Sequence, residues 1–287
     1  MSSVINTNTA SLAAQINLSG AQSALTQSVE RLSSGLRINR AKDDAAGLGV
    51  SEALQKQING VKQGIQNLND GISLSQTAEG ALSAVAEITQ RMITLATQGA
   101  NGTLNATQTG AIKTELLALK DSINDIAKRT NFTGTTLFAG SEIKLQVSND
   151  AGDVVTISQA ALAKIKLSSV DADTTTESKA LFTAIDALTA GITTAKMGTI
   201  QTAASAYLDT ITTQRGALGA FQNQLEYTVN NLSDFYNNLS AARSRVIDTD
   251  YAAETANLTR GQILQQAATA MLAQANQIDR KSTRLNS

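Results

Sequence analysis

The sequence contains no cysteine, proline, histidine or tryptophan among its 287 residues. Without cysteine the chain has no disulfide bonds or thiolate metal sites, and without histidine it lacks the commonest general base. Because proline disrupts helices, its absence permits very long uninterrupted ones. Aromatic residues make up only 3% of the chain, so Ala, Leu, Ile and Val must fill the core, which suits helices packed side by side.

The charge and hydropathy of the chain argue against two classes of partner. The net charge is −1, and Lys and Arg form no stripe of the kind that nucleic-acid-binding proteins carry. No stretch reaches the roughly 18 apolar residues that a membrane-spanning helix needs. Residues 1–20 lack the basic start and apolar run of a secretory signal peptide. We therefore expect no nucleic-acid or membrane partner, and export, if it occurs, by a route without a cleaved signal peptide.

Regular spacing of apolar residues predicts helices over most of the chain. Near the N-terminus the apolar positions step by four and three, and they are Leu25, Val29, Leu32 and Leu36. A second row recurs every seven residues and consists of Ile211, Leu218, Leu225, Leu232, Leu239 and Val246. Such rows are typical of helices that pack against partner helices. The second row implies one helix over about residues 200–246, roughly 70 Å long at ~1.5 Å per residue.

Polar and glycine-containing stretches interrupt the helical pattern. Gly35 predicts a helix end, because glycine accepts the left-handed cap conformation. Asp43 and Asp44 can cap the next helix start, where the helix dipole favours a carboxylate. Residues 98–108 predict a turn between helices, and residues 131–140 predict a second loop.

The pattern in the middle of the chain changes from helical to alternating. Apolar residues alternate over 143–147 and 155–157, on either side of the polar stretch 148–153, which predicts a β-hairpin. Residues 168–178 predict a polar loop. A further helix should follow, with its apolar face formed by Leu181, Ile185, Leu188 and Ile192. The expected fold class is mainly α: a long antiparallel helical bundle or coiled coil with a small central β-hairpin region.

The sequence offers little support for catalysis or metal binding. Neighbouring carboxylates occur at Asp43 and Asp44 and at Asp248 and Asp250. They could form a metal site or an acid–base pair, but we favour helix capping and surface ion pairing as their role. Residues 149–153 resemble part of a calcium loop but lack its terminal Glu, so a hairpin turn is the better interpretation. We expect no catalytic residues, no metal and no cofactor.

Two charged clusters lie where the end segments meet the long helical body. Exposed charges of this kind contribute little to stability by themselves. Our hypothesis is that the clusters meet, within or between subunits, and fix the register of packing. Their members are Arg37, Arg40, Asp43 and Asp44 in the first cluster, and Arg243, Arg245, Asp248 and Asp250 in the second.

Two long motifs resemble one known family. SVERLSSGLRINRAKDDAAGLGVSEAL (28–54) closely resembles the N-terminal signature of bacterial flagellins, and residues 4–15 resemble their first residues. Residues 218–277 resemble the C-terminal signature, so the resemblance covers about 1–140 and 199–277. It implies a non-enzymatic subunit that polymerises into the extracellular flagellar filament for motility. It also implies export of unfolded subunits by the flagellar type III system.

The resemblance also implies a division of the chain into three parts. Residues 1–42 together with 250–287 would be terminal helices that form the inner core of the filament. Residues 43–140 together with 199–249 would form a helical rod domain. Residues 141–198 would be a small insert with the β-hairpin and a short helix, in place of the large outer domains of longer relatives. The chain is thus expected to be a short flagellin whose ends are covered fully only by other copies.

The family further suggests partners. These are other copies of the chain, the export chaperone, the cap and hook-associated proteins, and an animal Toll-like receptor. The residues that match the receptor-binding pattern are Gln90, Arg91, Leu95, Gln98 and Glu115. Ile93 and Thr94 stand where the receptor-binding pattern usually has an Arg-Glu pair. The alternative interpretation of Leu95 is a position in the core of the helix bundle. Residues 278–287 are polar and basic where the family continues with an apolar turn, so innermost packing and chaperone binding depart from the family pattern there.

Three other functions compete with a filament subunit. A hook–filament junction protein shares related terminal helices, but continuous similarity through both signatures favours flagellin. An adhesin or receptor ligand would be compatible as a secondary role. An enzyme inserted in the central region is disfavoured, because the roughly 58 residues there are few for a catalytic domain and lack His and Cys.

Overall fold

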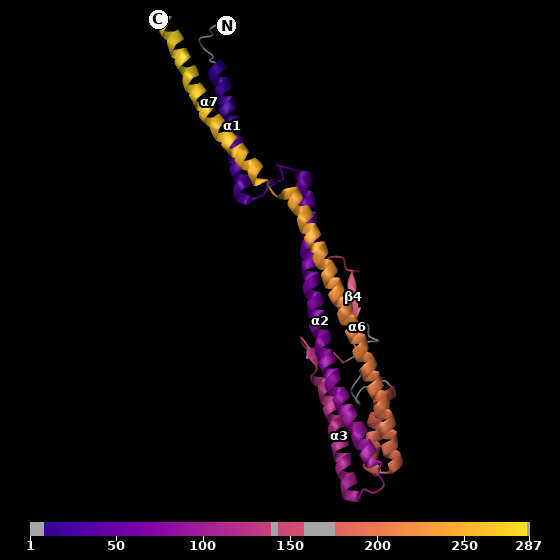
Figure 1. Cartoon of the computed structure of the whole chain (residues 1–287). Helices are drawn as coiled ribbons and strands as arrows, with labels where there is room; N and C mark the ends of the chain where they lie inside the picture. The colour runs from indigo at the N-terminus through magenta and orange to yellow at the C-terminus, as the bar shows by residue number, and fades with distance from the viewer. Residues whose placement is uncertain (1–8, 139–142, 158–175, 286–287) are drawn as a thin grey trace. The chain divides into compact units, whose positions relative to one another are not determined.

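The computed structural model describes residues 9–138, 143–157 and 176–285 (Figure 1). The chain divides into two compact units. The end unit comprises residues 1–56 and 238–287, and the middle unit comprises residues 57–237. Helices dominate both units, as predicted. They are α1 (Thr9–Ser34), α2 (Ala45–Gly99), α3 (Ala106–Arg129), α5 (Thr176–Asp186), α6 (Thr194–Ile247) and α7 (Tyr251–Leu285), with a short 3₁₀ helix η2 (Ala187–Ala190).

The predicted helix boundaries are largely confirmed. The long helix expected over about 200–246 is α6. Gly35, with φ of +72°, follows the end of α1, and its amide donates to the Arg31 carbonyl at 2.9 Å. Asp44 precedes α2 and accepts a hydrogen bond from the Gly47 amide at 2.9 Å. Polar residues that satisfy free backbone groups therefore end and start these helices where the sequence indicates.

The predicted β-hairpin is confirmed. Strand β3 (Ile143–Gln146) pairs antiparallel with β4 (Val154–Ile157), and Leu145 lies opposite Val155. The loop predicted at 131–140 is partly wrong, because β1 (Asn131–Phe132) pairs there with β2 (Thr135–Thr136). Strands of two residues are too short to produce an alternating pattern, so the sequence gives no sign of them.

The helix predicted through Ile192 ends earlier than expected. The α-helix stops at Asp186, η2 continues to Ala190, and Gly191 turns the chain with φ of +108°. The Lys196 ammonium donates to the Gly191 carbonyl at 2.8 Å, which satisfies a group at this break. Residues 176–178, predicted as loop, belong to the start of α5, and residues 168–175 lie outside the described residues.

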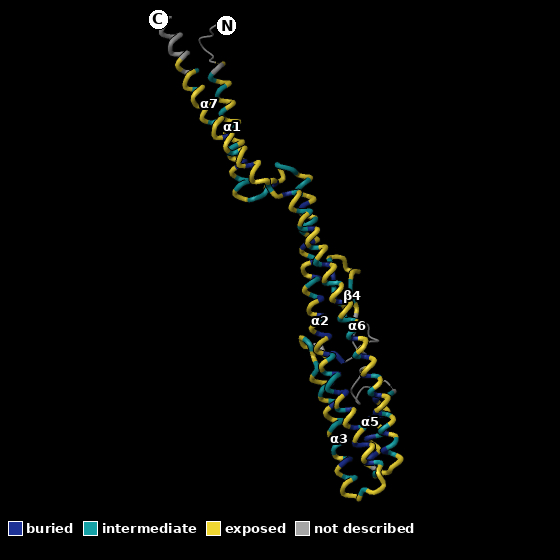
Figure 2. Tube along the Cα trace, viewed as in Figure 1, coloured by how far each residue is buried: buried dark blue, intermediate teal, exposed yellow. Residues whose placement is uncertain are grey.

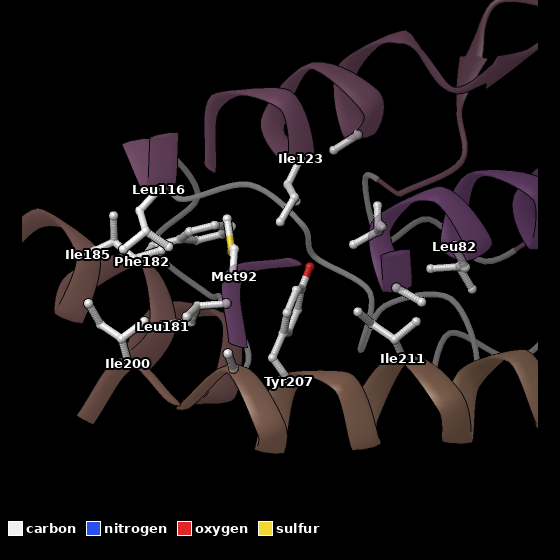
Figure 3. Close-up of a cluster of buried hydrophobic side chains, with 14 of the residues drawn as sticks. Leu82, Met92, Leu116, Ile123, Leu181, Phe182, Ile185, Ile200, Tyr207 and Ile211 are labelled. Atoms are coloured by element: carbon white, nitrogen blue, oxygen red, sulfur yellow. The ribbon is translucent and has the colours of Figure 1, made fainter. Parts of the chain in front are cut away.

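A buried apolar cluster joins four helices of the middle unit (Figure 3). The cluster draws side chains from α2, α3, α5 and α6, among them Met92, Leu116, Phe182 and Tyr207. The rings of Phe182 and Tyr207 lie 6.3 Å apart between centroids. Burial raises the pKa of the Tyr207 phenol, and its hydroxyl has no hydrogen-bond partner among the described residues. The short helix of the central region is thus part of the core of this unit.

Candidate assembly surface

Helices α1 and α7 run antiparallel and pack against each other along the end unit (Figure 1). Their least exposed positions recur at steps of three and four, which defines one face of each helix. On α1 this inner row is Ser11, Ala14, Leu18, Ala21, Leu25 and Ser28. On α7 it is Glu254, Leu258, Gly261, Gln265, Ala268 and Leu272.

The inner rows contain many small and polar residues. Gly261 of α7 lies against Leu25, and a Cβ atom at Gly261 would be 3.4 Å from the Leu25 Cδ1 atom. The buried Glu254 carboxylate pairs with Arg31 at 3.7 Å. The Tyr251 hydroxyl donates to the Leu32 carbonyl at 3.4 Å. Because apolar burial supplies most of the stability of helix packing, this pair holds itself together weakly for its length.

Large apolar side chains lie outside the inner rows, where the end unit leaves them in solvent. Figure 2 colours much of α7 as exposed. On α1, Leu12 is 54% exposed and Ile16 is 65% exposed. On α7, Ile263, Leu264 and Met271 are 60%, 52% and 61% exposed. These exposed apolar side chains make the outer faces of the two helices a candidate site of interaction.

The two outer flanks of α7 differ in chemistry. Leu264, Ala267 and Met271 are three to seven residues apart, so they share one flank, which we call the apolar flank. The other flank carries an unbroken polar row at steps of four and three: Thr255, Thr259, Gln262, Gln266 and Thr269. All of these side chains are exposed. An apolar partner can therefore pack against only one of the two flanks of α7.

The structure places the predicted packing rows mostly inside the chain. Leu25, Leu32 and Leu36 are half-buried, while Val29 is 51% exposed. In the second row, Ile211, Leu218, Leu225, Leu232 and Leu239 are buried by this chain alone, and Val246 is half-buried. Their role in packing between subunits stays a prediction. The sequence analysis missed the apolar flank, although the spacing of Leu264, Ala267 and Met271 could have indicated it.

The two charged segments lie together within the end unit. The Arg37 amide donates to the Ile247 carbonyl at 2.6 Å, and its guanidinium donates to the Val246 carbonyl at 2.5 Å. The Thr249 amide donates to the Gly35 carbonyl at 3.0 Å. Backbone groups and the Arg37 side chain thus make the contact between the two charged segments. Among the described residues, Arg243 and Arg245 form no ion pair with the acidic members of either cluster.

The acidic members of these clusters act on nearby backbone amides. Asp43 accepts hydrogen bonds from the Arg40 and Asn39 amides at 3.0 and 3.2 Å, and the bond from Arg40 is the main cause that lowers its pKa. Asp250 caps α7 by accepting from the Ala252 amide at 2.9 Å. Asp248 accepts from the Ser244 hydroxyl, and Arg40 pairs with Glu30 at 2.7 Å. Whether the clusters set the register between subunits stays a prediction.

The predicted receptor-binding residues are divided between surface and core. Gln90 and Gln98 are exposed on α2, and Arg91 forms an ion pair at 2.7 Å with Glu115 of α3. Leu95 is only 1% exposed and belongs to the core, which was the alternative role. Receptor recognition through this patch stays a prediction.

The described part of the chain offers neither a metal site nor a membrane-spanning helix. No group of three or more acidic side chains there could hold a metal ion. None of the described helices combines the length and apolar character that crossing a membrane requires.

Comparison with known proteins identifies the family. The model of the bacterial flagellin N-terminal helical region matches residues 5–143, and that of the C-terminal helical region matches residues 200–285. The chain is 40% identical to a flagellin of Bacillus subtilis over 95% of this chain and 96% of the relative. It is 41% identical to a flagellin of Halalkalibacterium halodurans (91% and 90%) and 34% identical to polar flagellin F of Vibrio parahaemolyticus (96% and 97%). None of these relatives is named as a hook-associated protein. With both helical regions matched in order and only residues 144–199 between them, the chain belongs to the bacterial flagellin family as a short structural subunit of the flagellar filament.

Proposed function

We propose that this flagellin polymerises through the outer faces of α1 and α7, which pack against the same helices of neighbouring copies. The exposure of Leu12, Ile16, Leu264 and Met271 carries this proposal, because these side chains are large, apolar and left in solvent by the chain's own packing. Burying apolar surface contributes about 25 cal/mol per Å². Unlike surfaces on α1 and α7 give heterologous contacts, and these produce an open helical polymer when the rotation does not close.

Each part of the chain would have its own place in the polymer. Residues 1–42 with 250–287 would line the inside of the filament, and residues 43–140 with 199–249 would form the rod around them. Residues 141–198 would form the small insert. The middle unit supports this arrangement, because its own apolar cluster gives it a core that needs no neighbouring copy. The end unit has no comparable set of large buried side chains among its described residues.

The weakly packed end unit also suits export and controlled assembly. A small and polar seam between α1 and α7 opens at low cost, so a free subunit can be unfolded for passage through a narrow channel. We propose that the flagellar type III apparatus exports the chain without cleaving a signal peptide. An export chaperone would cover the apolar flank before assembly, and the cap and hook-associated proteins would meet the chain at the growing end.

Replacing Leu264 with alanine tests the role of the apolar flank. We expect the critical concentration for polymerisation to rise about tenfold or more, because interface anchors cost at least that much when truncated. The exposed Leu264 contributes little to the free subunit, so its far-UV circular dichroism should be unchanged. Salt-induced assembly of purified protein, measured by sedimentation and electron microscopy, gives the critical concentration.

Gln262→Ala is the matched control on the polar flank of the same helix. Its critical concentration should stay within about twofold of the native chain, because polar side chains exchange one hydrogen-bond partner for another. Equal effects of Leu264→Ala and Gln262→Ala, or no effect of either, would show that the apolar flank is not the packing surface.

A further inference from the structure

The composition of the chain leaves few side chains for an oxidant to attack. Cysteine, tryptophan and histidine are absent, and there are four methionines. Hydroperoxides convert methionine to its sulfoxide, and susceptibility follows exposure. The methionine side chains are thus the main targets of peroxide in this protein.

The described methionines differ sharply in exposure. Met92 and Met197 are 0% exposed and lie in the apolar cluster of the middle unit. Met271 is 61% exposed on α7. Met1 lies outside the described residues. An oxidant that reaches the folded subunit should therefore modify Met271 well before Met92 and Met197.

The exposed methionine also lies on the proposed packing surface. Met271 shares the apolar flank of α7 with Leu264, seven residues earlier, and is separated from the polar row of the other flank. Methionine adapts its flexible thioether to irregular apolar contacts, whereas its sulfoxide is polar and chiral. One oxygen atom at this position places a strong hydrogen-bond acceptor on the apolar flank.

We propose that Met271 is an oxidation-sensitive site at which hydroperoxides block assembly of the free subunit, an inference that rests on the proposed function of the apolar flank. The thioether sulfur attacks one oxygen of hydrogen peroxide, a sulfur–oxygen bond forms, and the oxygen–oxygen bond breaks. The sulfur loses two electrons, the peroxide gains them, and water leaves. Neighbouring copies cover the same sulfur in the filament and protect it.

The loss of assembly follows from the cost of burying the sulfoxide. An acceptor without a partner in apolar surroundings lowers an association constant by about tenfold or more. The critical concentration of the oxidised subunit should rise by at least that factor. The middle unit should keep its fold, because its two methionines are out of reach.

The first measurement is the site of oxidation. Free subunits and assembled filaments are treated with hydrogen peroxide and digested with trypsin, which places Met92, Met197 and Met271 in separate peptides: 92–113, 197–215 and 261–280. Met271 of the free subunit should oxidise on the order of tenfold faster than Met92 or Met197, in line with its exposure. It should be protected in filaments. Equal rates for the three residues, or equal rates for Met271 in subunit and filament, would overturn the proposal.

The second measurement is the assembly of the treated subunit. Met271→Leu keeps the volume and apolar character of the side chain and removes the reactive sulfur. Peroxide should raise the critical concentration of the native chain about tenfold or more, and should leave that of Met271→Leu at the value of its own untreated protein. Methionine sulfoxide reductases specific for the two epimers, with dithiothreitol, should restore assembly of the native chain.

The outcomes separate this inference from the function on which it rests. If oxidised native subunits assemble as well as untreated ones, oxidation of Met271 does not block assembly and this inference is wrong. The proposed packing surface would still stand. If peroxide also raises the critical concentration of Met271→Leu above that of its untreated form, the damage lies elsewhere and the inference is wrong. If neither oxidation of Met271 nor the substitution Leu264→Ala impairs assembly, the apolar flank itself is not the packing surface.

Discussion

Replacing Gly64 with alanine is expected to detach the β3–β4 hairpin from α2 and to lower the free energy of unfolding of the middle unit by about 3 kcal/mol. A Cβ atom at Gly64 would lie 1.8 Å from the Val147 carbonyl oxygen. This obstacle is backbone, which cannot rotate away as a side chain can. The hairpin must move, and it would lose the hydrogen bond that the Asn67 amide donates to the Gln146 carbonyl at 2.8 Å.

Other glycines of α2 show that the helix is shaped for the hairpin. A Cβ atom at Gly60 would lie 2.8 Å from Asn149, and one at Gly71 would lie 2.3 Å from the Leu145 Cδ1 atom. Gly60, Gly64 and Gly71 are four and seven residues apart, so they share one face of the helix. The hairpin approaches this face more closely than any side chain would permit.

Gly80→Ala on the same helix is the matched control. Nothing lies within 4 Å of a Cβ atom placed at Gly80. Alanine should therefore stabilise the helix by about 0.5–1 kcal/mol, because it reduces the freedom of the unfolded chain. Urea unfolding followed by circular dichroism gives both free energies. Equal stabilisation by the two substitutions would show that the hairpin does not rest on Gly64.

Replacing Phe182 with alanine should lower the free energy of unfolding of the middle unit by about 3–5 kcal/mol. Phe182 is 2% exposed and packs among side chains from α2, α3 and α6 (Figure 3). Truncating the ring leaves a cavity that rigid neighbouring helices cannot collapse to fill. Thermal and urea unfolding of the purified chain measure the loss.

Thr183→Ala is the matched control, because Thr183 is the exposed neighbour on the same helix. Its effect should stay within about 0.5 kcal/mol, as for most surface substitutions. A small effect of Phe182→Ala would mean that α5 is only loosely attached and that the apolar cluster does not depend on it.

The helical body could be predicted from sequence because its apolar spacing coincides with its burial. Every member of the row from Ile211 to Leu239 is buried, so the period of seven residues correctly located α6. The 143–157 hairpin was equally accessible through alternation. The break after Asp186 was not, because Leu188 and Ile192 continue the helical spacing, and the positive φ of Gly191 cannot be known from the residue alone.

The candidate assembly surface was harder to predict for a different reason. The inner face of α1 includes Ser28, which is 6% exposed, while Val29 beside it is 51% exposed. A method that follows apolar residues selects Val29 and overlooks Ser28. The spacing of Leu264, Ala267 and Met271 indicates an apolar row, but only the structure separates that row from the positions that α1 covers.

The central claim is that neighbouring copies cover the apolar flank of α7, and thiol labelling at position 264 tests it most directly. The chain has no cysteine, so Leu264→Cys introduces the one reactive thiol, and the native chain serves as the blank. A maleimide should modify this thiol readily in the free subunit, on the order of tenfold or more slowly in filaments formed above the variant's own critical concentration, and readily again after depolymerisation. A thiol that reacts equally fast in filaments and in free subunits would contradict the account.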